Sequence, residues 1–121
     1  FGNTSVAGVS GSAIANFAVQ FVGYPYVLGG NSLTRGTDCS GFIKLVLAEF
    51  GINGPRIPEG YLYMGHSVSR SEMKPGDIIC YGGHVAMYIG NGQIVHASTA
   101  RTGIKLGNAT YKSWITIRRV L

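Results

Sequence analysis

The sequence predicts a single domain of the α+β class, with N-terminal helices packed on an antiparallel sheet of five to six strands. Apolar residues recur at helical spacing only before Gly51, whereas short strand-like segments follow the turn signature Lys74-Pro75-Gly76-Asp77. Helices first and strands second favour this class over alternating α/β folds. A chain of 121 residues can form one core and bury about two-thirds of its unfolded surface.

The N-terminal part predicts a linker tail followed by one amphipathic helix. Residues 1–11 are small, polar and rich in glycine and serine, so the folded domain is expected over 12–121. The helix is expected from Ser12, with Ser10 or Ser12 as its N-cap, because apolar residues then recur three and four positions apart. The next segment, from Tyr24 to Gly30, holds a proline and paired glycines and is expected to be extended.

A second helix is predicted to begin at Asp38 or Cys39 and to end before Gly51. It is apolar on nearly all sides, so protein must cover most of its surface. Cys39 then lies in the first turn, where backbone N–H groups and the helix dipole favour a thiolate. The segment 52–74 has weak periodicity and is expected to be a loop with a short helix at the border of a cleft.

Five strands are predicted after that segment, each bounded by glycine, asparagine or serine. They cover residues 78–81, 84–89, 93–98, 103–106 and 115–120. Side chains alternate along a strand, so the hairpin between the second and third of these strands decides whether His96 shares the face of His84.

The loop of that hairpin has two alternatives. A two-residue loop, Asn91-Gly92, would set His84 and His96 on opposite faces, whereas a three-residue loop, Gly90-Asn91-Gly92, would oppose Ala86 to His96 and unite the two rings. We predict the three-residue loop, because a shared face brings both imidazoles into one site.

Cys39, His84 and His96 form a candidate nucleophile system of thiol, base and orienting group. If His84 meets Cys39, transfer of the thiol proton gives a thiolate and an imidazolium. His96 would bond the second ring nitrogen of His84 and fix its tautomer. The expected reaction is acyl transfer, most simply amide hydrolysis, with the backbone N–H of Cys39 as a donor to the oxyanion.

Composition argues against nucleic acid, a membrane span and a zinc site. A net charge of +5 suits an anionic environment such as nucleic acid, a membrane surface or a bacterial wall polymer, and the charge alone does not choose among them. The basic residues are scattered and form no nucleic-acid-binding stripe. No apolar run approaches the roughly 20 residues of a membrane span. Cys39 and Cys80 lack zinc-type spacing, and Cys80 is expected in the core.

Five segments of the sequence resemble, in order, the signature segments of the NlpC-type cell-wall endopeptidases. They are Tyr26-Val27-Leu28-Gly29-Gly30, Asp38-Cys39-Ser40-Gly41-Phe42, Lys74-Pro75-Gly76-Asp77, His84-Val85-Ala86-Met87-Tyr88-Ile89-Gly90 and Ile94-Val95-His96-Ala97. This resemblance implies a papain-like α+β domain that cuts peptidoglycan stem peptides, usually between γ-D-glutamate and the diamino acid that follows. By this likeness Cys39 is the nucleophile, His84 the base and His96 the orienting residue, without metal or cofactor.

The resemblance also implies substrate-binding residues and a location. The family has a tyrosine at the position of Tyr26, and the residues flanking its cysteine can hold the free amine of an N-terminal L-alanine, which Asp38 and Ser40 suit chemically. Asp38 fits equally well as the N-cap of the helix. Gly83, which opens the backbone before His84, is expected to border the substrate. The protein is expected in the bacterial envelope or secreted, monomeric and joined to an upstream domain.

Several alternatives stay open. A related papain-like acyl hydrolase or transferase could use the same thiol and imidazole on a lipid or another amide. A non-catalytic wall-binding module would tolerate loss of Cys39. Metal binding through Cys39, His84 and His96 matches no known zinc spacing. Leu28 stands where many members of the family have an aromatic residue, which leaves substrate preference open, and His66 is expected to be an ordinary surface residue.

Overall fold

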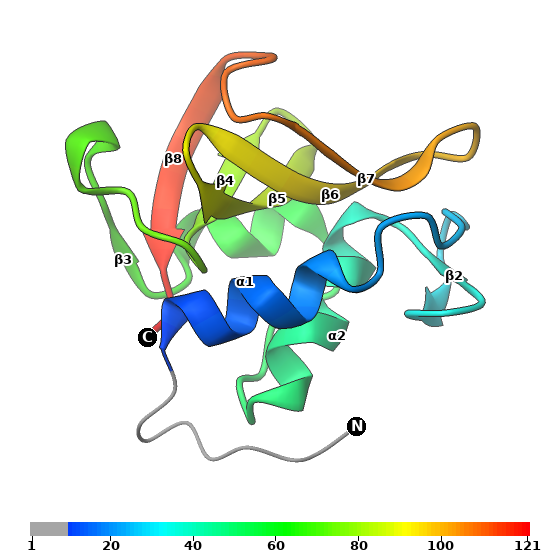
Figure 1. The fold of residues 1–121 in the computed structure, drawn as a ribbon. Coiled ribbons are helices and arrows are strands. Elements are labelled where there is room, and N and C mark those ends of the chain that lie inside the picture. The colour runs from blue at the N-terminus through cyan, green and yellow to red at the C-terminus, as the bar shows by residue number, and fades with distance from the viewer. Residues whose placement is uncertain (1–9) are drawn as a thin grey trace.

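The structure, a computed structural model that describes residues 10–121, has helices packed on an antiparallel sheet (Figure 1). Six strands form the main sheet in the order β3-β8-β4-β5-β6-β7. The predicted α+β class and strand number are therefore confirmed. Most of the predicted linker tail, residues 1–11, lies outside the described residues; Gly11 already belongs to the first helix.

Both predicted helices are present. Helix α1 spans Gly11–Val19 and is capped by Ser10, whose hydroxyl accepts a hydrogen bond from the N–H of Ala13 at 3.0 Å. Helix α2 spans Cys39–Glu49 with Asp38 as its N-cap. Neither helix of the described chain has the length and hydropathy of a membrane-spanning segment.

The five predicted strands appear within two residues of their expected ends. They are β4 (Ile78–Tyr81), β5 (His84–Gly90), β6 (Gln93–Thr99), β7 (Gly103–Asn108) and β8 (Trp114–Arg119). Three short strands, β1 (Asn31–Ser32), β2 (Gly36–Thr37) and β3 (His66–Ser67), were not predicted. The weakly periodic segment contains β3 and two 3₁₀ turns, Pro58–Tyr63 and Arg70–Glu72.

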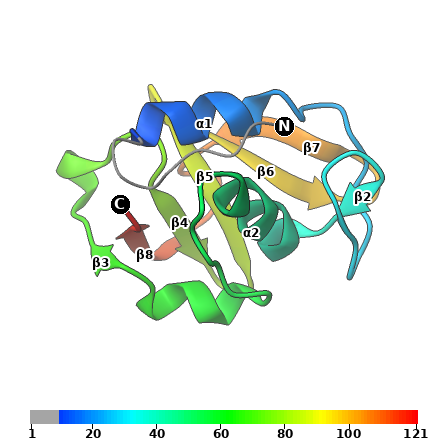
Figure 2. The same ribbon diagram turned by 90° about the horizontal axis from the view of Figure 1, so that it is seen from below.

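The helices cover one face of the sheet (Figure 2). Val85, Met87 and Val95 point to that face and join the buried side of α2 in the main core. Ala86 and Ile94 point to the other face, where a second and smaller cluster forms. His84, two residues before Ala86 in β5, belongs to this second face.

The hairpin between β5 and β6 corrects one prediction. Its loop has two residues, Asn91 and Gly92, both with positive φ, and Gly90 pairs with Gln93. The predicted three-residue loop is therefore wrong, because Asn-Gly takes the tight turn that hairpins favour. A bulge between Tyr88 and Gly90 supplies the extra residue inside the strand instead.

The bulge restores the register that the three-residue loop was expected to give. Beyond it, Tyr88 opposes Ile94 and Met87 opposes Val95. Because side chains alternate, this register sets His96 on the same face of the sheet as His84.

Candidate active site

Cys39 is the first residue of α2, and its side chain is 8% exposed. The backbone N–H of Val85 faces the sulfur, together with the N–H groups of Ser40 and of Cys39 itself. Val85 directly follows His84 in β5, so the thiol lies against the end of the strand that carries the imidazole.

His84 and His96 are joined by a hydrogen bond. Nε2 of His84 lies 2.8 Å from Nδ1 of His96, and the ring centroids are 5.0 Å apart in an edge-to-face arrangement. His96 is buried, at 2% exposure, inside β6. This contact leaves Nδ1 of His84 as the ring nitrogen that can exchange a proton with another group.

Burial decides the charge state of the unliganded site. It raises the pKa of the Cys39 thiol, with a further rise from Asp38, while the N–H groups that face the sulfur oppose the change. It lowers the pKa of His84 to about 4, with help from Lys112, and the pKa of His96 to about 4, with help from His84 and Lys105. Near neutral pH the site therefore rests as neutral thiol and imidazoles. The helix dipole alone had predicted a stabilised thiolate, but loss of hydration outweighs it here.

Asp38 is held by four contacts from three residues and caps the helix. Its Oδ1 accepts from the N–H of Gly41 at 3.0 Å, and its Oδ2 accepts from the N–H of Gly29 at 2.9 Å. Nη1 of Arg56 lies 2.8 Å from Oδ1, and Nη2 lies 3.3 Å from Oδ2. Although burial opposes the change, these partners lower the pKa of Asp38. The cap thus stays a carboxylate, and binding of a substrate amine by Asp38 remains a prediction.

Arg56 is the residue of this region that the sequence did not single out. Besides Asp38, its guanidinium donates to the carbonyl of Gly30 at 3.0 Å and to the side-chain carbonyl of Asn31 at 2.8 Å. Ser40 is buried and donates to the backbone carbonyl of Arg56 at 2.6 Å. Arg56 thereby ties the loop before the first 3₁₀ turn to the start of the cysteine helix. A single arginine in an irregular segment carries no local signal for such a role.

The two remaining predicted substrate residues border the same region. Tyr26 lies close enough to Cys39 and Asp38 for their charges to act on it, and burial, followed by these charges, raises the pKa of its phenol. Its hydroxyl is therefore a hydrogen-bond donor at neutral pH. Gly83 is exposed, with a positive φ of 70° that favours glycine. It borders a pocket of about 110 Å³ together with Pro58, Glu59, Leu62, Tyr81 and Ile115.

The turn between β7 and β8 adds aromatic and cationic groups that sequence reasoning missed. The Tyr111 ring lies 5.4 Å from that of His96, 6.5 Å from that of His84 and 5.2 Å from that of Tyr81. Nζ of Lys112 lies 6.0 Å from the centroid of Tyr81. These residues reach the histidines from a distant part of the chain, so only the folded topology brings them together.

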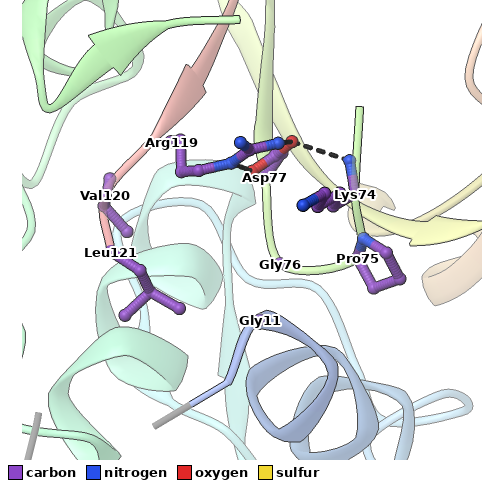
Figure 3. A pocket seen from close by; sticks show the side chains of 8 residues that line it. All are labelled: Gly11, Lys74, Pro75, Gly76, Asp77, Arg119, Val120 and Leu121. Atoms are coloured by element: carbon purple, nitrogen blue, oxygen red, sulfur yellow. Dashed lines mark hydrogen bonds and ion pairs between the residues drawn. The ribbon is translucent and has the colours of Figure 1, made fainter. Parts of the chain in front are cut away.

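A second pocket lies where β4 begins and β8 ends, away from the site at Cys39 (Figure 3). There Arg119 clamps the buried Asp77 with two contacts of 2.9 Å, and the N–H of Lys74 donates to the same carboxylate at 2.8 Å. This pair joins the end of β8 to the start of β4 and takes no part in the site at Cys39.

Cys80 lies in the core, fully buried, as predicted. Burial raises the pKa of its thiol to about 11. Within residues 10–121, no three or more His, Cys, Asp or Glu side chains gather in a way that could hold a metal ion.

Comparison with known proteins identifies one family over most of the chain. Residues 23–119 match the NlpC/P60 family. A probable endopeptidase NlpC homolog of Haemophilus influenzae is 36% identical over 93% of this chain and 62% of its own length. The murein DD-endopeptidase MepS/murein LD-carboxypeptidase of Escherichia coli K12 is 39% identical over 85% of this chain and 57% of its own length. The chain thus spans about three-fifths of these relatives.

Solved structures agree with the sequence match. The crystal structure of an NlpC/P60 family protein from Bacillus cereus superimposes with a TM-score of 0.87 and 28% identity, over 93% of this chain and 41% of that one. The shared sequence, the shared fold and the motif order lead to one conclusion. The chain belongs to the NlpC/P60 family.

Proposed function

We propose that this domain is a cysteine endopeptidase that hydrolyses the stem peptides of bacterial peptidoglycan, at the bond between γ-D-glutamate and the diamino acid. The observation that carries the proposal is the 2.8 Å hydrogen bond between His84 and His96, with the sulfur of Cys39 against the next residue of the same strand. A thiol, a base and an orienting group in this order form an acyl-transfer system. The E. coli relative is named a murein endopeptidase, which supports the wall polymer as substrate.

The first step forms a bond between the Cys39 sulfur and the γ-carbonyl carbon of the D-glutamyl residue. The thiol proton passes to Nδ1 of His84 as the sulfur attacks, so the S–H bond breaks while the S–C bond forms. Nε2 of His84 must then carry a hydrogen and donate it to Nδ1 of His96, which aims the imidazolium at the sulfur. The backbone N–H of Cys39 and the hydroxyl of Tyr26 can stabilise the oxyanion.

The second half of the reaction releases both products. The C–N bond breaks as the imidazolium of His84 gives its proton to the leaving amine, and a thioester remains on Cys39. Water then attacks the thioester carbon, loses a proton to His84 and expels the sulfur, which takes the proton back. Thiol and imidazole return to their neutral starting states, which are the states that burial favours in the free site.

A second candidate bond comes from the name of the E. coli relative, a DD-endopeptidase. The same nucleophile could open the D,D cross-link between two stems, because the chemistry at the carbonyl is identical. The two bonds differ in the groups that flank the carbonyl, so subsites around the thiol, and not the thiol itself, decide between them.

Mass spectrometry of chemically defined muropeptides digested with the purified domain tests the proposal. Cleavage of uncrosslinked stems into a glutamyl product and a diamino acid product supports the γ-D-glutamyl bond, and release of intact monomer stems from cross-linked dimers supports the D,D bond. Cys39→Ala should abolish either reaction, with Cys80→Ala as the matched control. Retained binding to wall material without cleavage by the wild-type domain would instead indicate a wall-binding module, and release of fatty acid or another amide product a different hydrolase.

We further propose that the protein acts outside the cytoplasm, in the envelope or after secretion, as a monomer. Its proposed substrate is found in that compartment, and its net charge of +5 favours association with an anionic wall polymer. Size-exclusion chromatography with light scattering tests the monomer, and fractionation of the native cells tests the location.

A further inference from the structure

The Lys112 ammonium lies over the ring of Tyr81, and that ring is next to His84. Its Nζ lies 6.0 Å from the centroid of the Tyr81 ring, and that ring lies 6.1 Å from the ring of His84. The Tyr111 ring contacts both histidine rings, so the neighbouring residue fixes the backbone of Lys112 at the edge of the site. The hydroxyl of Tyr81 donates to the carbonyl of Ala109 at 2.6 Å, which holds the same turn in place.

Lys112 has no carboxylate partner in the described chain. Residues 10–121 contain two ion pairs, Arg56 with Asp38 and Arg119 with Asp77, and neither includes Lys112. The Lys112 side chain is exposed to solvent, so its ammonium is available to a ligand.

The charge balance of the site is positive. Asp38, the buried acidic residue beside Cys39, is matched by Arg56, and both histidines are neutral near pH 7. Lys112 and Lys105, which lies opposite His96 in the sheet, add positive charge next to the imidazoles. A cation beside a general base makes the base weaker, so its placement is unfavourable for proton transfer unless it serves another purpose. An anionic group on the substrate supplies that purpose.

We propose that Lys112 binds a carboxylate of the stem peptide next to the scissile bond. This inference rests on the proposed function. A γ-linked glutamyl residue keeps its α-carboxylate free beside the bond, and diaminopimelate carries a second carboxylate that lysine lacks. Either group is a suitable partner for a primary ammonium at the edge of the site. Lys112 thereby selects stems that carry an unmodified carboxylate.

The test compares matched muropeptides that differ in one group. One stem has both carboxylates free, one is amidated at the D-glutamyl α-carboxyl, one is amidated at diaminopimelate, and one has lysine in place of diaminopimelate. We expect the wild-type domain to lose about tenfold in kcat/KM on the stems that lack the bound carboxylate, as for loss of one charge-assisted hydrogen bond at a partly exposed site. The substrate that suffers this loss identifies which carboxylate Lys112 holds.

Variants separate recognition from structure. Lys112→Met should lose about tenfold on the free acid and cleave acid and amide forms at rates within about twofold of each other, whereas Lys112→Arg should keep the wild-type preference. Lys74→Met, an exposed lysine at the far pocket, should behave as wild type. Unchanged acid preference in Lys112→Met, or equal cleavage of all four stems by the wild type, would overturn the inference and leave the proposed function standing. A wild type that cleaves none of the stems would overturn the proposed function and this inference with it.

Discussion

Nε2 of His84 and Nδ1 of His96 lie 2.8 Å apart, and because both rings are neutral near pH 7, one proton lies between these two atoms. One nitrogen donates and the other accepts, so each ring fixes the tautomer of its partner. A proton taken up at Nδ1 of His84 requires His84 to be the donor in this pair. The relationship makes His96 a positioning residue, which acts on the thiol only through His84.

The two histidines should therefore differ in the size of their effects. We expect His84→Ala to reduce kcat/KM by about 10³-fold or more, and His96→Ala by about 10²-fold, because loss of orientation costs less than loss of the base. His96→Gln can still accept a hydrogen bond and should recover part of the loss. His66→Ala, at an exposed histidine of β3, is the matched control and should leave the rate unchanged. Equal losses in His84→Ala and His66→Ala would contradict the assignment.

The two free cysteines offer a matched pair of substitutions. Cys39→Ala should lower muropeptide cleavage by about 10⁴-fold or more while leaving thermal unfolding close to wild type. Cys80→Ala should do the reverse, with a loss of about 1 kcal/mol in the free energy of unfolding and an unchanged kcat. Circular dichroism melts and initial rates measure the two effects. Full activity in Cys39→Ala would refute its role as nucleophile.

The pH profile of kcat/KM should have its acid limb at unusually low pH. The pKa of His84 is lowered to about 4, so the imidazole remains able to accept a proton down to that pH, and kcat/KM should fall only as pH drops through about 4. The raised pKa of Cys39 places the alkaline limb above the ordinary range of a thiol. In Lys112→Met the acid limb should move to higher pH, because a neighbouring cation that disfavours imidazolium is gone. A wild-type acid limb near 6.5 would show that the imidazole is hydrated in solution.

Stability should depend on the same titrations. The folded pKa values of His84 and His96 lie near 4, below the usual value of 6.5, so the unfolded chain binds more protons between these limits. The free energy of unfolding should therefore fall as pH is lowered from about 6.5 to about 4, and this contribution should level off below. Urea denaturation across that range checks the slope. Replacement of both histidines by glutamine should flatten it.

The two ion pairs separate stability from catalysis. Arg56→Met leaves the carboxylate of Asp38 without its guanidinium at the start of α2, and we expect a loss of about 1–2 kcal/mol together with a lower kcat. Arg119→Met breaks the pair with Asp77 at the far end of the sheet and should cost a similar amount with kcat unchanged. Urea denaturation and initial rates give both quantities. Equal kcat values in the two variants would mean that Arg56 does not position the cysteine helix.

Local patterns predicted both helices, the five longer strands and the faces that their residues share. The helix that begins at Cys39 and its Asp38 cap could be predicted, because a short polar side chain before an apolar run is a local signal. Alternation along β5 placed His84 correctly, although the extra residue of the hairpin lies in a bulge at Ile89 and not in the loop. A three-residue loop and a two-residue loop with a bulge both place His84 and His96 on one face of the sheet. The sequence alone does not distinguish the two arrangements.

Contacts between distant parts of the chain could not be predicted. Arg56 lies in an irregular loop, and its bonds to Asp38, Gly30 and Asn31 depend on how that loop folds over α2. Tyr111 reaches the histidines only through the turn after β7. The rise in the pKa of Cys39 could not be predicted from the motif either. The sequence shows where the helix starts, but not how deeply the thiol is buried.

Gly11 and Leu121 border the same pocket, where the Asp77 and Arg119 clamp closes the sheet. The first turn of α1 and the last residue of the chain are thus near neighbours in space. A short flexible connector could bridge them, and the backbone could be reopened at the exposed turn around residues 100–102. Such a circular permutant should refold with its thiol and imidazoles in the same places. Because Gly11 and Leu121 lie close together, the unpermuted domain should also tolerate insertion into a surface loop of an unrelated scaffold.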